Sequence, residues 1–192
     1  MIKNQGFSRI ILSVGYKKEK VIKYLQNKHD IEIVFSKENN PLGTGGAIIH
    51  AKKYIHSDNF IVMNGDTFIN INFLDLYNYH MKFNSHLTIV GAESKSDSGY
   101  GSMRISENNL ILNFNEKPTK TNNNHINAGV YVFNKKVMKL FPKKKKFSIE
   151  KDFFSKNDEI RMLHYNSESD LYDVGTPERL INFKKYINFF NE

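Results

Sequence analysis

The chain has 192 residues and a formal net charge of +8, and 40% of its residues are hydrophobic. This is enough apolar content for one folded domain, and it excludes a disordered tail. The absence of cysteine excludes disulfides, thiolate metal sites and cysteine nucleophiles. No apolar run approaches the roughly 20 residues that span a bilayer, and residues 1–8 contain no secretory signal, so we expect a cytoplasmic protein.

The positive charge has one dense run, at residues 143–146, and elsewhere the lysines are mixed with acidic residues and asparagines. A run of this kind is most often a solvated loop. The sequence contains no RNA-binding or helix-turn-helix pattern that we can place, so we expect no nucleic acid partner and no membrane contact. A phosphorylated small-molecule substrate suits the basic charge as well. Salt-dependent nucleic-acid binding stays open as a rival.

The first half of the chain alternates between predicted strands and helices. Apolar runs rich in β-branched residues predict buried strands, and apolar residues at helical spacing predict the helices between them. The expected strands are residues 9–14, 31–35, 60–63 and 87–90, and the expected helices are residues 17–26, 47–54 and a helix capped by Asn72. This alternation predicts an α/β fold of Rossmann-like type, with a mixed, mainly parallel sheet and helices on both faces.

The second half has a different pattern. Residues 101–105 and 110–115 read as an antiparallel pair, followed by strands at 128–133 and 160–164. Thr176 and Pro177 mark the start of a C-terminal helix. Its buried face is expected to contain Leu180, Phe183, Ile187 and Phe190. We find no internal repeat and no linker, so a single domain over residues 1–192 is expected.

Two acidic residues lie at the ends of predicted elements, and the first of them could hold a metal ion. Asp66 follows the predicted strand at 60–63, and ligands of open α/β sheets gather at the carboxyl ends of strands. A carboxylate held there is suited to Mg²⁺. Asp173 lies just before the predicted C-terminal helix. The structural alternatives are an ordinary Gly-Asp turn at Asp66 and an ordinary helix entry at Asp173.

Two further motifs could bind substrate. Residues 42–47 form a glycine-rich segment that opens a helix and would let a nucleotide approach the backbone, although it is not a Walker loop. Glu116 and Lys117 place an acceptor beside a cation, which can hold a sugar hydroxyl and a phosphate. The alternatives are a structural glycine connection and a surface ion pair. His80, on a helix with apolar neighbours, is expected to be packed.

The order of these motifs resembles the sugar-1-phosphate nucleotidyltransferase family over nearly the whole chain. The segments that support the resemblance are residues 42–47, 64–67, 99–101, 115–118, 127–131 and 172–176. Among subfamilies, the chain is most similar to the short guanylyltransferases for D-glycero-D-manno-heptose 1-phosphate or mannose 1-phosphate. Residues 11–16 and 147–152 favour the heptose branch.

The resemblance implies transfer of a nucleoside monophosphate, GMP from GTP, to a sugar 1-phosphate with release of pyrophosphate. Such an enzyme uses Mg²⁺ and serves nucleotide-sugar synthesis for surface polysaccharide; a homo-oligomer stays open. The implied catalytic residues are Asp66, Asp173 and Lys117, with both aspartates holding the metal. The implied substrate-binding residues are Leu42, Gly43, Thr44 and Gly45 for the nucleotide, and Asn64, Tyr100, Gly101, Glu116, Lys117, Asn127 and Gly129 around the sugar phosphate.

The chain departs from the family pattern at its start. The family's first strand, its Gly-x-Gly-Thr-Arg loop for the triphosphate and its Pro-Lys-Pro segment have no counterpart here. The absent strand is expected in the middle of the sheet, so two inner strands would lack a partner. Three explanations stay open: a sequence that begins too late, a segment supplied by another chain, or an inactive relative that binds sugar phosphate or nucleotide without turnover.

Overall fold

The computed structural model describes residues 3–26, 31–93, 100–116, 125–156 and 159–190. The chain divides into two compact units, each built from two separate segments. Unit 1 comprises Met1–Phe60 and Lys135–Asp158, and unit 2 comprises Ile61–Asn134 and Glu159–Glu192. We describe each unit by itself, and the single domain expected from the sequence stays a prediction.

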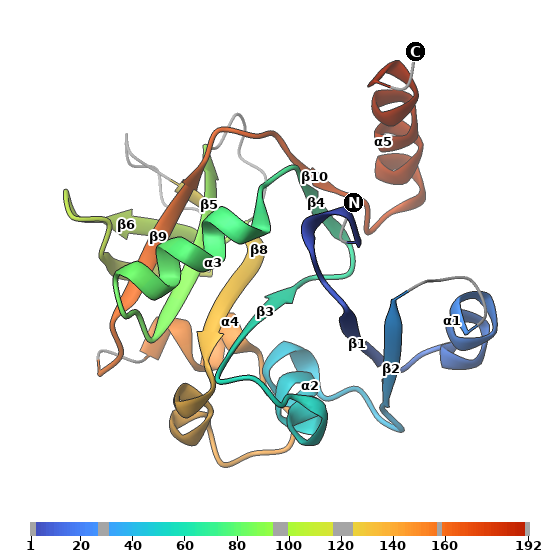
Figure 1. Cartoon of the computed structure of the whole chain (residues 1–192), viewed down its shortest axis with the longest axis horizontal. Helices are drawn as coiled ribbons and strands as arrows, with labels where there is room; N and C mark the ends of the chain where they lie inside the picture. The colour runs from blue at the N-terminus through green and yellow to red at the C-terminus, as the bar shows by residue number, and fades with distance from the viewer. Residues whose placement is uncertain (1–2, 27–30, 94–99, 117–124, 157–158, 191–192) are drawn as a thin grey trace. The chain divides into compact units, whose positions relative to one another are not determined.

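Unit 1 contains two strands and several short helices (Figure 1). Its elements are the 3-10 helix η1 (Lys3–Gln5), β1 (Arg9–Val14), α1 (Lys18–Leu25), β2 (Glu32–Lys37), α2 (Gly43–Ala51), η2 (Lys52–Tyr54), η3 (Lys135–Leu140), α4 (Ile149–Asp152) and η4 (Phe154–Lys156). Ser148 caps α4, because its hydroxyl accepts a hydrogen bond from the Lys151 amide at 3.2 Å. Serine is a common residue at the N-cap of a helix.

Strands β1 and β2 form a separate parallel two-stranded sheet, in which Ile11 lies opposite Val34. The apolar run of β1 predicts a buried strand, but within the described residues only Val14 of β1 is buried and the other apolar side chains are half-buried. Helix α1 likewise has no buried residue. The prediction of full burial was therefore wrong here, because β1 has β2 as its only strand neighbour in the described part of the chain.

Unit 2 contains the larger sheet. Its elements are β3 (Asn59–Met63), which begins in unit 1, then β4 (Thr67–Ile69), α3 (Phe73–Lys82), β5 (Leu87–Glu93), β6 (Ser102–Ile105), β7 (Ile111–Asn115), β8 (His125–Asn134), β9 (Met162–Ser167), β10 (Leu171–Asp173) and α5 (Pro177–Phe190). Asn72 caps α3 as predicted, accepting hydrogen bonds from the amides of Leu74 at 2.9 Å and Asp75 at 3.2 Å.

The six-stranded sheet has the order β7-β6-β8-β5-β9, with β3 also paired to β8. The mixed α/β prediction is confirmed. The strand directions differ from the mainly parallel expectation: β5 and β9 are parallel, while β5 with β8, β6 with β8 and β6 with β7 are antiparallel. The reason is β8, a ten-residue strand that follows the β6–β7 hairpin and inserts beside β5.

The core of unit 2 lies along β5 and β8, whose apolar side chains are almost all buried. Helix α3 packs against β8 and β9 and lies across β9 in Figure 1. His80 of α3 is 1% exposed and lies 2.8 Å from the Thr88 hydroxyl, which confirms that it is packed. Burial lowers the pKa of His80 to about 4.

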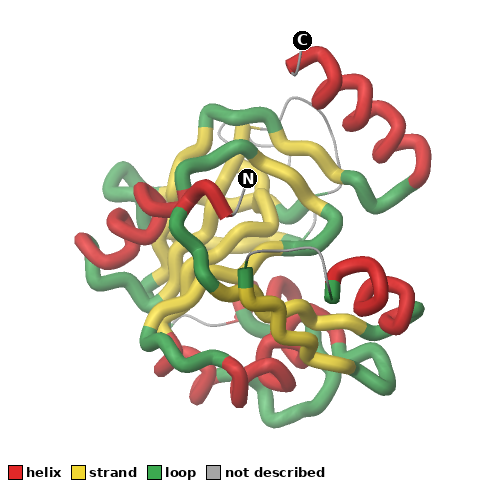
Figure 2. Tube along the Cα trace, turned by 45° about the vertical axis from the view of Figure 1, so that its right-hand side comes forward, coloured by secondary structure: helices red, strands yellow, loops and turns green. Residues whose placement is uncertain are grey.

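Helix α5 stands off the six-stranded sheet (Figure 2). Phe183 packs on Phe68 and Tyr172 with ring centroids 4.8 and 5.3 Å apart. Leu180 and Ile187 are exposed, so the predicted buried face of this helix was wrong at both positions. The side chain of Phe190 lies outside the part of the chain that the structure describes.

Among the helices of the described residues, none has the length and apolar content that crossing a bilayer requires.

Candidate active site

The two aspartates predicted as metal ligands lie together in unit 2. Asp66 occupies the turn between β3 and β4, and Asp173 is the last residue of β10. Strands β4 and β10 pair antiparallel, with Asp173 opposite Thr67 (Figure 1). The Val174 amide also donates to the Asp66 carbonyl at 2.7 Å. This short ladder joins residues more than 100 positions apart in the chain and sets the two carboxylates side by side.

Gly175 separates the two carboxylates and leaves room for both. A Cβ atom added at Gly175 would lie 3.1 Å from Oδ1 of Asp173 and 3.4 Å from Oδ2 of Asp66. The separation of the two oxygens therefore cannot exceed the sum of these distances. We call Asp66 and Asp173 the acid pair.

Within the acid pair, the Asp173 carboxylate has more hydrogen-bond partners than the Asp66 carboxylate. Its Oδ1 accepts a 2.7 Å hydrogen bond from the Gly175 amide, and its Oδ2 accepts one from the guanidinium of Arg179 in α5. Asp66 is exposed, and its side chain accepts a longer hydrogen bond, 3.4 Å, from the Thr67 hydroxyl. One member of the pair is thus held in place, and the other faces solvent.

Tyr100, predicted to contact the sugar, lies in the same cluster. Burial raises the pKa of the Tyr100 hydroxyl, and the negative charges of Asp173 and Asp66 raise it further, while Arg179 lowers it. The hydroxyl therefore lies within electrostatic reach of the acid pair and stays protonated at neutral pH.

Asn64 and Gly129 are also brought together. The Asn64 amide donates to the Gly129 carbonyl at 2.8 Å. Gly129 has a φ of +68°, and a Cβ there would lie 2.8 Å from Nδ2 of Asn64. Only glycine meets both conditions, so this residue lets the loop that carries Asp66 lie directly against β8.

Asn127 links the β8 backbone to Gly101. Its amide donates to the Gly101 carbonyl at 2.8 Å, and its side chain donates to the Tyr131 hydroxyl at 2.8 Å and accepts from the Gly129 amide at 3.0 Å. These contacts give Asn127 a structural role in shaping β8, beside any contact it makes with a sugar.

Of the remaining predicted residues, Glu116 is exposed after β7, and Lys117 lies outside the described residues.

The glycine-rich segment lies in unit 1, where it forms the first turn of α2 rather than a loop. The amides of Gly45 and Gly46 both donate to the Phe147 carbonyl, at 3.1 and 3.4 Å. A Cβ at Gly45 would lie 2.1 Å from the Phe147 ring, and one at Gly43 would lie 2.5 Å from the Phe147 carbonyl oxygen. Contact with Phe147 therefore accounts for these glycines by packing alone.

Thr44 and Leu42 have internal partners as well. The Thr44 hydroxyl donates to Glu150 at 2.7 Å and accepts from the Ile149 amide at 2.8 Å. The Leu42 amide donates to the Glu38 carboxylate at 3.1 Å. We call Gly43–Gly46 with these contacts the glycine-rich turn.

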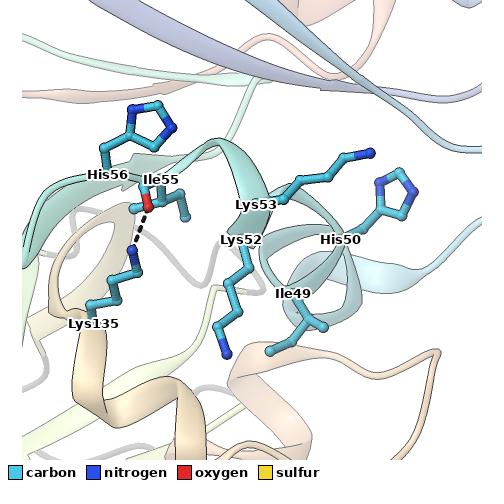
Figure 3. Close-up of a pocket in the computed structure, with 7 residues that line it drawn as sticks. All are labelled: Ile49, His50, Lys52, Lys53, Ile55, His56 and Lys135. Carbon is cyan, nitrogen blue, oxygen red and sulfur yellow. Dashed lines mark hydrogen bonds between the residues drawn. The ribbon is translucent and has the colours of Figure 1, made fainter.

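Unit 1 also has a basic pocket of about 730 Å³ (Figure 3). Lys135 donates its ammonium group to the Ile55 carbonyl, while Lys52 and Lys53 point in different directions. Cations near the end of α2 and η2 complement the helix dipole, so the pocket has a structural explanation. No predicted site residue lines it; the lining residues are Ile49, His50, Lys52, Lys53, Ile55, His56 and Lys135.

Sequence reasoning missed Arg179 and the two short strands β4 and β10. The only signal for Arg179 was its position six residues after Asp173, in the first turn of a predicted helix. Three-residue strands have too few side chains to give a periodic pattern. Phe147 and Glu150, the partners of the glycine-rich turn, had no signal as contacts because they lie about 100 residues away in sequence.

Comparison with known proteins adds to this geometry. The sequence model of the nucleotidyl transferase family, "Nucleotidyl transferase", matches residues 1–188. D-glycero-alpha-D-manno-heptose 1-phosphate guanylyltransferase of Aneurinibacillus thermoaerophilus is 35% identical over 92% of this chain and 77% of its own. Mannose-1-phosphate guanylyltransferase catalytic subunit beta of Drosophila melanogaster is 34% identical over 90% of this chain, which spans 48% of that protein's length.

Among solved structures, the chain is similar in sequence and in fold to a protein called HddC. The crystal structure of HddC from Yersinia pseudotuberculosis complexed with GMP-PN is 33% identical to this chain, with a TM-score of 0.82. The match covers 96% of this chain and 81% of HddC. The similarity therefore extends to both units of the described fold.

Proposed function

The chain belongs to the nucleotidyl transferase family, and we propose that it is a guanylyltransferase that joins GMP, from GTP, to D-glycero-D-manno-heptose 1-phosphate. Support comes from the heptose 1-phosphate relative, of which the chain spans 77%, and from the GMP-PN complex of HddC. Mannose 1-phosphate is the second acceptor to test, because mannose 1-phosphate guanylyltransferases are 34% identical.

The observation that carries the proposal is the meeting of the acid pair at Gly175. Mg²⁺ prefers oxygen ligands and is usually held by one or two carboxylates together with substrate phosphates. No group of three or more His, Asp or Glu side chains that could hold a metal ion is present among the described residues. Two carboxylates, one of them exposed, fit the Mg²⁺ pattern and do not fit a closed structural site.

In the proposed reaction, an oxygen of the sugar phosphate attacks the α-phosphorus of GTP. The bond from that phosphorus to the bridging oxygen of the β-phosphate breaks, and pyrophosphate leaves. Asp66 and Asp173 would hold Mg²⁺, which when bound neutralises phosphate charge. Positioning accounts for most of the remaining rate enhancement, because no covalent intermediate is needed.

The other residues take roles in substrate binding under this proposal. Tyr100 and Gly101 would contact the sugar beside the acid pair. Glu116 would accept hydrogen bonds from sugar hydroxyls, and Lys117 would pair with the sugar phosphate as the remaining catalytic residue. Asn64, Asn127 and Gly129 would border the sugar. Leu42 with Gly43, Thr44 and Gly45 would border the nucleotide only as a second role, beside their packing contacts. We also propose a cytoplasmic location, where nucleoside triphosphates are available.

The test is pyrophosphate release by the purified chain with GTP, Mg²⁺ and heptose 1-phosphate. We expect release that depends on both substrates and is faster than with mannose 1-phosphate or with ATP. An Asp66→Asn variant is the negative control. Binding of the sugar phosphate without any pyrophosphate release would instead support the non-catalytic alternative.

A further inference from the structure

Arg179 of α5 forms an ion pair with the acid pair, at Asp173. Its guanidinium donates to Oδ2 of Asp173, while Oδ1 of the same carboxylate accepts from the Gly175 amide. Both oxygens of Asp173 are thus engaged within the chain. The Asp173 side chain is 23% exposed and that of Arg179 is 52% exposed, so the contact lies where solvent and ions can reach it.

Asp66 differs from Asp173 in this respect. It has a single weak side-chain hydrogen bond, from Thr67 at 3.4 Å, and it forms no ion pair within the described residues. A divalent cation could therefore reach Asp66 without displacing a protein group. At Asp173 the same cation would meet a guanidinium that is already in place.

The position of Arg179 is not explained by the stability of α5. The residue lies in the first turn of the helix, and its amide donates to the Thr176 hydroxyl at 3.3 Å. The N-terminal end of a helix carries a partial positive charge, so a cation in the first turn is disfavoured. The contact with Asp173 offsets this cost, which links Arg179 to the acid pair and not to the helix.

We propose that Arg179 is an internal counter-ion of the acid pair, which holds Asp173 until a divalent cation displaces the guanidinium from that carboxylate. The proposal rests on the proposed function, because it takes the acid pair as the metal site. Two cations beside one carboxylate oxygen repel each other, so Arg179 on Oδ2 of Asp173 opposes the binding of a metal ion at that oxygen. The consequence is a lower affinity of the resting enzyme for divalent cations.

The simpler explanation is a surface ion pair that only adds stability. Such exposed pairs contribute little to the free energy of unfolding, and on this explanation Arg179 does not compete with a metal ion for Asp173. That explanation predicts the same metal affinity with and without Arg179. The two explanations therefore differ in a direct binding measurement that needs no nucleotide and no turnover.

The experiment is a calorimetric titration of the whole chain with Mn²⁺ in the absence of substrates. We expect Arg179→Gln to bind Mn²⁺ about 5-fold tighter than the unchanged protein, because it removes a competing cation. Arg179→Lys keeps the charge and should stay within about 2-fold. Lys184→Gln is the matched control, since it removes one exposed positive charge from the same helix and should leave the affinity unchanged.

Unchanged or weaker Mn²⁺ binding by Arg179→Gln would overturn the counter-ion proposal, as would a failure of every variant to bind Mn²⁺. Thermal unfolding of each variant checks that its fold is retained. Pyrophosphate release, measured in parallel, separates the two proposals. If pyrophosphate is released but Arg179→Gln binds Mn²⁺ with unaltered affinity, the enzyme assignment stands and the counter-ion proposal fails. If Arg179→Gln binds Mn²⁺ more tightly but no pyrophosphate is released, the counter-ion proposal stands and the enzyme assignment fails.

Discussion

The glycine-rich turn of unit 1 and the two segments that supply the acid pair of unit 2, residues 64–67 and 172–176, look alike in sequence, since each combines glycine with polar residues. In the structure they differ. In the glycine-rich turn, the Thr44 hydroxyl and the amides of Gly45 and Gly46 are all used by the segment around Phe147. In the acid pair, two carboxylates approach each other and Asp66 faces solvent.

This difference indicates what each motif is for. Polar groups that support a fold are satisfied within it, as the glycine-rich turn is. Two neighbouring carboxylates repel each other and do not stabilise a fold, so their convergence points to a cation and to function. Substitutions in the first region should therefore lower stability, and those in the second should lower activity.

The largest expected effect is on turnover, from Asp66→Asn. We expect the rate of pyrophosphate release to fall about 100-fold or more, because the change removes a charge at the metal site. The thermal midpoint should stay within about 2 °C, since Asp66 is exposed and not packed. Asp58→Asn, at an exposed aspartate of unit 1, is the matched control and should keep full activity.

The next effect is on stability, from Gly45→Ala. The added Cβ would lie 2.1 Å from the ring of Phe147, which is only 3% exposed. We expect the free energy of unfolding, measured by urea denaturation, to fall by about 3 kcal/mol because the ring has little room to move.

Two other glycines sharpen this test. Gly65→Ala places its Cβ in open space and should leave stability unchanged. Gly175→Ala places its Cβ against both carboxylates and should lower activity more than stability. Equal loss of stability at Gly45 and Gly65 would show that the contact with Phe147 is not the cause.

The sequence was sufficient for the elements that have a local residue pattern over four or more residues. The expected β1 matches the observed strand, and the hairpin of β6 and β7 follows from its two apolar runs. The cap at Asn72 follows from the hydrogen-bonding chemistry of its side chain. Each of these signals is local, which is why residue patterns were enough.

Contacts between distant segments could not be predicted from local pattern. Strands β4 and β10 are each three residues long, and their pairing depends on chain topology. The resemblance to a family, and not periodicity, predicted that Asp66 and Asp173 converge. Neither route predicted Arg179 or the exposure of Leu180, because both depend on where α5 lies after β10.

Acid should affect unit 2 through its buried histidines. Burial, and then the charge of His125, lowers the pKa of His164 to about 3, against 6.5 in the unfolded chain. The unfolded state therefore binds the proton first as the pH falls below 6.5, and stability is lost from there toward pH 3. We expect His164 to account for about 2 kcal/mol of the loss between pH 7 and pH 5.

The measurement is urea denaturation at pH 7, 6 and 5 for the unchanged chain and for His164→Met, which cannot take up a proton. The pH dependence should be shallower in His164→Met, whatever its stability at pH 7. His56→Met, at an exposed histidine of unit 1, should keep the original slope. An identical slope in all three proteins would remove buried His164 as the cause.

The smallest expected effect returns to the glycine-rich turn, at Thr44. Thr44→Val leaves the Ile149 amide, at the start of α4, without its 2.8 Å acceptor. The free energy of unfolding should fall by about 1 kcal/mol, and Thr44→Ser, which keeps the hydroxyl, should lose less. If packing is the main role of this turn, the KM for GTP stays unchanged in both variants. A raised KM with unaltered stability would instead assign the Thr44 hydroxyl to the nucleotide, and the contrast between the two regions would no longer hold.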